Sequence, residues 1–214
     1  MADCCELKTF NGLSRRYKQA LWAVIGINAT MFIVEMSAGI SSGSQALKAD
    51  ALDFAGDTAT YGLSLLVIGA SAKTRASAAR FKAATLALMA FVILAWTFAR
   101  VSQGHPPEAN TMGYVGLAAL SANLLSVVIL LKWRDGDSNV RSVWLCSRND
   151  AVGNVGVLCA GLLVAMTGSA WPDLLVATAL AGLFLNSAVK IFIQARSELK
   201  ARTPASSCAT GTIQ

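Results

Sequence analysis

The chain has 214 residues, of which 55% are hydrophobic and only 14% are charged, whereas soluble domains carry about 25% charged residues. Its mean hydropathy is +0.54, and several apolar runs approach the roughly 20 residues that a helix needs to cross a bilayer. This composition excludes an ordinary soluble enzyme, a disordered chain and a disulfide-stapled secreted module, the last also because the five cysteines show no framework spacing. The net charge of +6 comes from basic residues between the apolar runs, which favours a membrane rather than nucleic acid as the partner.

The apolar runs divide the chain into six segments. We predict an all-α membrane protein with six transmembrane helices, in which residues 1–20 form a cytoplasmic N-terminal segment, 21–195 the helical domain and 196–214 a short, disordered cytoplasmic tail. Each run is long enough to cross the hydrocarbon core of a lipid bilayer. The predicted spans are Leu21–Ile40, Ala49–Ala72, Ala83–Val101, Met112–Leu131, Val143–Thr167 and Pro172–Ile193.

Basic residues are distributed unevenly among the connections between these spans. Fifteen of the 18 Lys and Arg residues lie before the first span, after the second, after the fourth, or at and beyond the end of the last. Only Lys48 and Arg100 fall on the other side, and Arg148 lies within the fifth span. Because basic loops stay in the cytoplasm, we predict a multi-pass protein of the cytoplasmic (inner) membrane with both termini in the cytoplasm.

Acidic residues inside the predicted spans are the most informative feature of the sequence. At about 100° per residue, three of them on the second span lie within about 60° of one another. A carboxylate at membrane depth is energetically costly and is a functional candidate by default. Arg148 is the only basic residue in the interior of a span, since Arg100 and Lys190 lie near span ends, so ion pairing cannot neutralise the whole set. The acidic residues singled out here are Glu35, Asp50, Asp53, Asp57 and Asp150; Asp173, the second residue of the sixth span, is not among them.

The fifth span repeats the spacing of the second. Cys146 and Asp150 are four residues apart, like Asp53 and Asp57, so each pair is stacked one helical turn apart. We expect the fifth helix to begin near Asn139, which places Asp150 about 16 Å along its axis, near mid-membrane. If these two helices face each other, three carboxylates and one thiol converge, and four such side chains can build a tetrahedral cation site.

Two stretches of the sequence resemble a known family. Residues 43–57, GSQALKADALDFAGD, are similar to the second helix of the cation diffusion facilitator (cation efflux) family, and residues 150–157, DAVGNVGV, to its fifth helix. Asn28 and Glu35 also fit the first helix of that family. The resemblance covers most of the predicted transmembrane part and agrees with six spans and cytoplasmic termini.

This resemblance implies a homodimeric exporter of divalent metal cations that is driven by proton antiport. It places the transport site on Asp53, Asp57, Cys146 and Asp150. Cys146 stands where the family commonly has His or Asp, and His105 is the only histidine, so the usual His-rich loop is absent. Because few residues follow the last span, the chain is identified as a short member lacking the C-terminal cytoplasmic domain, and dimerisation needs another basis.

The chemistry of the four groups explains how metal and protons could be exchanged. Three carboxylates crowded in a low dielectric cannot all stay ionised without a counter-charge, so some are expected to hold protons when no metal is bound. Because metal ligands must be deprotonated, metal binding releases protons and protonation expels metal. The same groups can therefore serve both ions in turn.

Other polar residues have two interpretations each. Asp50 lies nearer the outer surface, as an exit-path group or a support for the ligands. Glu35 either relays protons or makes a polar contact. Asn154, one turn beyond Asp150, is a candidate hydrogen-bond partner of the ligands. Arg148 either extends to the membrane surface or pairs with an acid.

The N-terminal segment carries a further candidate site. Cys4, Cys5 and Glu6 place two thiols beside a carboxylate, and in the reducing cytoplasm they could capture a soft metal before transport. The alternative is a flexible tail with incidental cysteines.

The predicted cargo is zinc first and cadmium second, because Zn²⁺ accepts mixed oxygen and sulfur ligands and Cd²⁺ gains more from a thiolate. No permanently bound cofactor and no nucleic-acid partner are expected. The alternative function is a non-transporting metal-binding membrane sensor or accessory subunit, and an ion channel would conduct without proton coupling. We predict that the chain is not an enzyme, since no nucleophile is accompanied by a base or a water-activating histidine.

Overall fold

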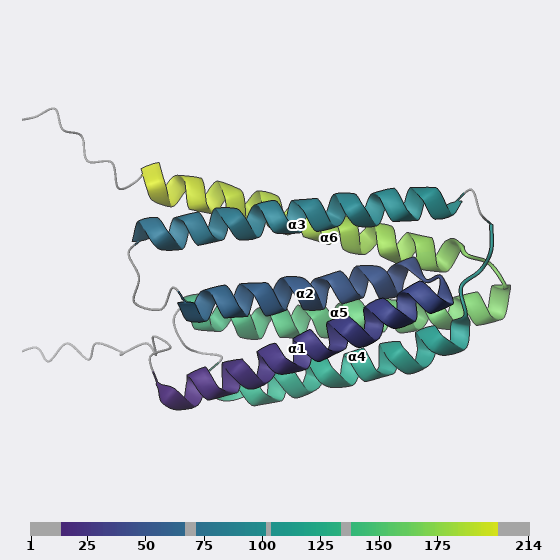
Figure 1. The fold of residues 1–214 in the computed structure, drawn as a ribbon, viewed down its shortest axis with the longest axis horizontal. Coiled ribbons are helices and arrows are strands. Elements are labelled where there is room, and N and C mark those ends of the chain that lie inside the picture. Colours follow the sequence, from purple (N-terminus) through teal and green to yellow (C-terminus); the bar gives the residue numbers. More distant parts are fainter. Residues whose placement is uncertain (1–13, 67–71, 102–103, 134–137, 201–214) are drawn as a thin grey trace, which may run out of the picture.

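The computed structural model describes residues 14–66, 72–101, 104–133 and 138–200. In this part of the chain all regular structure is helical, with six α-helices in the predicted order (Figure 1). A short 3-10 turn, η1 (Leu131–Trp133), follows the fourth of them. The helices are α1 (Arg15–Ser42), α2 (Gln45–Leu66), α3 (Ala72–Val101), α4 (Ala109–Leu130), α5 (Ser138–Thr167) and α6 (Trp171–Lys200).

The predicted six-helix architecture is confirmed, while some boundaries differ. The second span was expected to continue to Ala72, but α2 ends at Leu66 and Ala72 is the first residue of α3. The fifth helix begins at Ser138, next to the expected start at Asn139. α6 continues to Lys200, so residues 196–200 of the predicted tail are helical.

Five helices in the described part of the chain are long and apolar enough to cross a membrane on their own: α1, α3, α4, α5 and α6. Their large apolar side chains face outward, as with Phe98, which is 82% exposed. Since a lipid-facing surface of this kind suits a bilayer, the chain is an integral, multi-pass membrane protein.

α2 is the exception, and its 22 residues include Lys48 and three aspartates. Its 22 residues extend about 33 Å at 1.5 Å per residue, which matches the hydrocarbon thickness of about 30 Å. Asp50 is 1% exposed and Asp57 is 8% exposed, so these carboxyl groups face the protein and not lipid. α2 can therefore cross the membrane while its polar side is covered by neighbouring helices.

The helices form two groups (Figure 1). α3 and α6 pack along each other as a pair, and α1, α2, α4 and α5 form a set in which α1 contacts α2 and α4, and α4 contacts α5. α2 and α5 contact each other and also α6. An apolar core joins the two groups through Leu47 of α2, Ile93 of α3, Val157 of α5 and Phe184 of α6. The arrangement brings the acidic residues of α2 against α5.

Candidate metal site

Three of the predicted ligands meet between α2 and α5. Asp53 and Asp57 follow each other at one-turn spacing on the covered side of α2, where Asp57 is buried and Asp53 is partly buried. The carboxyl group of Asp150, on α5, lies close enough to both of them to interact with each. Three carboxyl groups this close repel one another when all are ionised, so protons or a cation must offset part of their charge.

The fourth predicted ligand, Cys146, lies one turn before Asp150 in α5. Its side chain falls outside the described residues, as do the side chain of Arg148 and the N-terminal residues Cys4, Cys5 and Glu6. Because residues four apart share one face of an α-helix, the register of α5 places Cys146 on the same face as Asp150.

The described side chains do not yet form a coordination shell. Among them, no group of three or more acid, thiol or imidazole side chains has an arrangement that could hold a metal ion. The carboxyl groups of Asp53, Asp57 and Asp150 lie within interaction range of one another. Metal binding by them would require a rearrangement of these side chains and the loss of any protons that they hold.

The other acidic residues extend the polar region along α1 and α2. Glu35 of α1 is fully buried and faces Asp50, and its carboxyl group also interacts electrostatically with Asp53. Glu35 and Asp50 are close enough to interact, but within the described residues neither Glu35 oxygen, nor Oδ2 of Asp50, makes a well-formed hydrogen bond. On α5, the buried Asn154 amide also lacks a hydrogen-bond partner in that part of the chain. The structure thus places Glu35, Asp50 and Asn154, which were predicted to support the ligands or the proton path, in the interior of the set formed by α1, α2, α4 and α5.

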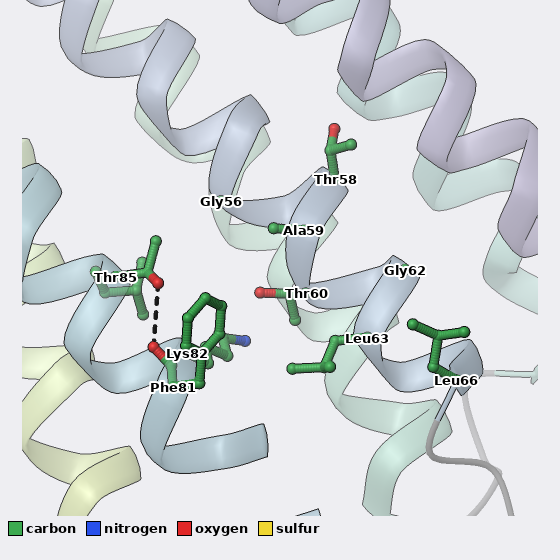
Figure 2. Close-up of a pocket in the computed structure, with 11 residues that line it drawn as sticks. Gly56, Thr58, Ala59, Thr60, Gly62, Leu63, Leu66, Phe81, Lys82 and Thr85 are labelled. Atoms are coloured by element: carbon green, nitrogen blue, oxygen red, sulfur yellow. Dashed lines mark hydrogen bonds between the residues drawn. The ribbon is translucent and has the colours of Figure 1, made fainter. Parts of the chain in front are cut away.

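A groove of about 280 Å³ separates α2 from α3 beside this region (Figure 2). Gly56, next to Asp57, lines the groove on the α2 side, and Phe81 and Lys82 line it on the α3 side. Lys82 attracts both Asp53 and Asp57 electrostatically. Arg148 was the only basic partner expected within the spans, so Lys82 is an addition that the structure supplies from α3.

Comparison with known proteins identifies the family of this chain. A family model described as the cation efflux transmembrane domain matches residues 21–200. The chain belongs to the cation efflux family. The family resemblance seen in the sequence is therefore confirmed, and membership in this family points to a transporter and not to an enzyme.

Several members of the cation efflux family are similar to this chain. The metal cation efflux system protein CzcD of Cupriavidus metallidurans is 29% identical over 169 residues, which cover 73% of this chain and 53% of that protein. The zinc transporter ZitB of Escherichia coli is 28% identical over 194 residues, covering 85% and 62% of the two chains. The cadmium, cobalt and zinc/H(+)-K(+) antiporter of Bacillus velezensis is 26% identical over 171 residues, covering 72% and 54%. The chain thus spans from just over half to three-fifths of the length of these relatives.

One residue at the pocket was missed by sequence reasoning. Tyr61 lies one turn beyond Asp57 on α2, is fully buried, and donates a hydrogen bond from its hydroxyl group to Oδ2 of Asp57. The same hydroxyl oxygen is 3.3 Å from Oγ of Ser147 on α5. The i, i+4 spacing from Asp57 was a signal that could have identified Tyr61. Its contacts hold Asp57 in place and join α2 to α5.

The Tyr61→Phe variant tests this orienting role. Because the phenol orients Asp57, we expect its removal to weaken divalent-metal binding at the candidate site about 10-fold, the low end of the effect of removing a ligand's hydrogen-bond partner. Metal affinity of the purified protein in detergent provides the measurement. Tyr114→Phe is the matched control, since Tyr114 is exposed on α4; equal affinities in both variants would contradict the role of Tyr61.

Proposed function

We propose that this protein exports divalent transition and heavy metal cations from the cytoplasm in exchange for protons, with zinc as the first cargo and cadmium as the second. One observation carries the proposal: Asp150 of α5 lies within interaction range of Asp53 and Asp57 of α2 inside a membrane-spanning helical set. Three carboxyl groups in one buried pocket bind either protons or a divalent cation, because each metal ligand must be deprotonated.

The proposed exchange follows from this competition. On the cytoplasmic side, a divalent cation displaces the protons shared by Asp53, Asp57 and Asp150, and its charge then compensates the carboxylates. On the opposite side, protons return to the carboxyl groups and the cation leaves. Inward movement of protons therefore drives metal outward, and metal affinity is expected to fall as the pH falls.

The identity of the cargo rests on the ligand set. Carboxylates with one thiolate from Cys146 suit Zn²⁺ and, more strongly, the softer Cd²⁺, whereas Ca²⁺ prefers six to eight oxygen ligands. The names of the relatives ZitB, a zinc transporter, and of the Bacillus cadmium, cobalt and zinc antiporter support the same cargoes. Cys4, Cys5 and Glu6 remain a proposed capture site for such metals at the cytoplasmic side.

The orientation and assembly are also proposals. The strong bias of basic residues supports cytoplasmic termini in a cytoplasmic (inner) membrane, by the positive-inside rule. We propose a homodimer as the working unit, on the basis of the family resemblance.

Transport by the purified protein in vesicles with an acidic interior and a metal-sensitive dye tests this function. Proton efflux should drive Zn²⁺ and Cd²⁺ into the vesicles, and uptake should cease when an ionophore collapses the pH gradient. Binding without uptake would instead indicate a sensor or an accessory subunit. Uptake that persists without the gradient would indicate a channel and would refute antiport.

A further inference from the structure

The N-terminus of α2, the helix that carries Asp53 and Asp57, is capped by a carboxylate of α6. Asp173, in the first turn of α6, accepts hydrogen bonds from the backbone N–H groups of Gln45 and Ala46 at 2.8 and 3.0 Å. It also accepts one from the Ser44 hydroxyl group at 2.5 Å. Asp173 is only 1% exposed. Sequence reasoning missed it, although it lies in the predicted sixth span.

These contacts complete the cap of α2. The first N–H groups of a helix have no partner within the helix, and a side chain just before the helix usually accepts them. Here Ser44 Oγ accepts the N–H of Leu47 at 3.0 Å, while Asp173 accepts those of Gln45 and Ala46. A negative charge at this end also suits the helix dipole. The first turn of α2 is therefore capped by Asp173 of α6 as well as by Ser44, which directly precedes α2.

The same turn is enclosed by α3. Gly43 has a φ of 76°, and a Cβ at this position would lie 2.4 Å from Nη2 of Arg100. Arg100, near the end of α3, also attracts Asp173 electrostatically. The beginning of α2 is thus joined to both members of the α3–α6 pair.

The other half of α2 is arranged differently. There the groove of about 280 Å³ lies between α2 and α3, and its lining extends from Gly56 to Leu66 along α2. Figure 2 shows the Thr60 and Leu63 side chains facing the groove opposite Phe81. α2 is therefore tied to the α3–α6 pair at its first turn and separated from α3 by open space along its later turns.

We propose that Asp173 is a positioning residue for transport, which fixes the first turn of α2 on α6 and so sets where the pocket on α2 lies relative to the α3–α6 pair. This inference rests on the proposed function. Asp53 lies about 12 Å along the axis from the start of α2, so Asp173 does not touch the cargo. Its role is to keep the pocket at a defined height and rotation relative to its neighbouring helices.

The test separates this coupling from simple helix capping. Asp173→Asn replaces one acceptor oxygen by an NH₂ group that cannot accept the backbone N–H groups. We expect zinc turnover per folded molecule to fall at least about 10-fold, because a misplaced site slows the reaction even from a distance. The equilibrium affinity for Zn²⁺ should change less than about 3-fold, since the pocket residues are untouched. Amide hydrogen exchange should rise at residues 45–47.

A second variant, Ser44→Asp in an Asp173→Ala background, restores a strong cap within α2 itself, and alanine has no polar group that could remake the tie to α6. We expect thermal stability and slow amide exchange to return while turnover stays low. If turnover recovers together with stability in the double variant, Asp173 acts only as a helix cap and the proposal is wrong. Normal turnover in Asp173→Asn would overturn it as well. Failure of the proposed function would differ, because then the wild-type protein would show no gradient-driven uptake.

Discussion

Asp57→Asn is expected to abolish gradient-driven uptake of Zn²⁺ and Cd²⁺. Asparagine keeps the size of the side chain and an oxygen that can accept the hydrogen bond from Tyr61, so the fold should persist. The variant loses a negative charge that no other described group on that turn of α2 can replace. Removing one partner of a buried charge pair costs about 2–5 kcal/mol of binding free energy, and each 1.4 kcal/mol is tenfold, so we expect a loss of at least about 30-fold.

Initial uptake rates and zinc affinity in detergent provide the measurement for Asp57→Asn. Glu108→Gln is the matched control, because Glu108 is an exposed acid just before α4 and its removal changes the net charge by the same amount. The control should transport like the wild type. Unimpaired uptake by a folded Asp57→Asn protein would reject the assignment of the site to α2.

Features that repeat along the chain were predictable from the sequence. Apolar runs of near-membrane length predicted the six helices, and the i, i+4 spacing of Asp53 with Asp57 and of Cys146 with Asp150 predicted which faces of α2 and α5 carry the acidic groups. The end of α2 was harder to predict, because the apolar run continues past Leu66 toward Ala72. Periodicity gives no sign of where a helix stops within such a run.

Contacts between helices distant in the sequence were not predictable. Asp173 is separated from Ser44 by 129 residues, and only the packing of α6 beside α2 makes it the cap of that helix. Lys82 was counted with the basic residues that orient the chain, yet the packing of α3 brings its charge to Asp53 and Asp57. The type of residue indicates that a polar partner is needed, while the fold decides which residue supplies it.

These contacts explain how α2 can carry three aspartates and Lys48 and still cross the membrane. Asp173 accepts hydrogen bonds from its first turn, its middle faces Asp150, and Asp57 further along accepts a hydrogen bond from Tyr61. Each partner comes from α2 itself, α5 or α6, so the stability of α2 depends on the positions of its neighbours. A helix supported in this way can respond to a change of charge in the pocket, whereas an apolar helix could not.

Cys146→Ser is expected to change the selectivity for metals more than the total transport. The proposed site offers one sulfur among oxygen ligands, and a thiolate favours Cd²⁺ more than Zn²⁺. Replacing sulfur by a hydroxyl group should therefore lower cadmium transport at least about 10-fold relative to zinc transport. Initial uptake rates for each metal at equal concentration and equal pH gradient give this ratio directly.

Cys159→Ser is the control for Cys146→Ser, because Cys159 lies on the same helix but is exposed. Its replacement should leave the cadmium-to-zinc ratio unchanged. Cys146→His should also lower the ratio while zinc transport continues, since an imidazole is a good zinc ligand without the softness of sulfur. A ratio that stays constant in both Cys146 variants would remove Cys146 from the proposed site and leave the three carboxyl groups of α2 and α5 to bind the metal without a thiolate.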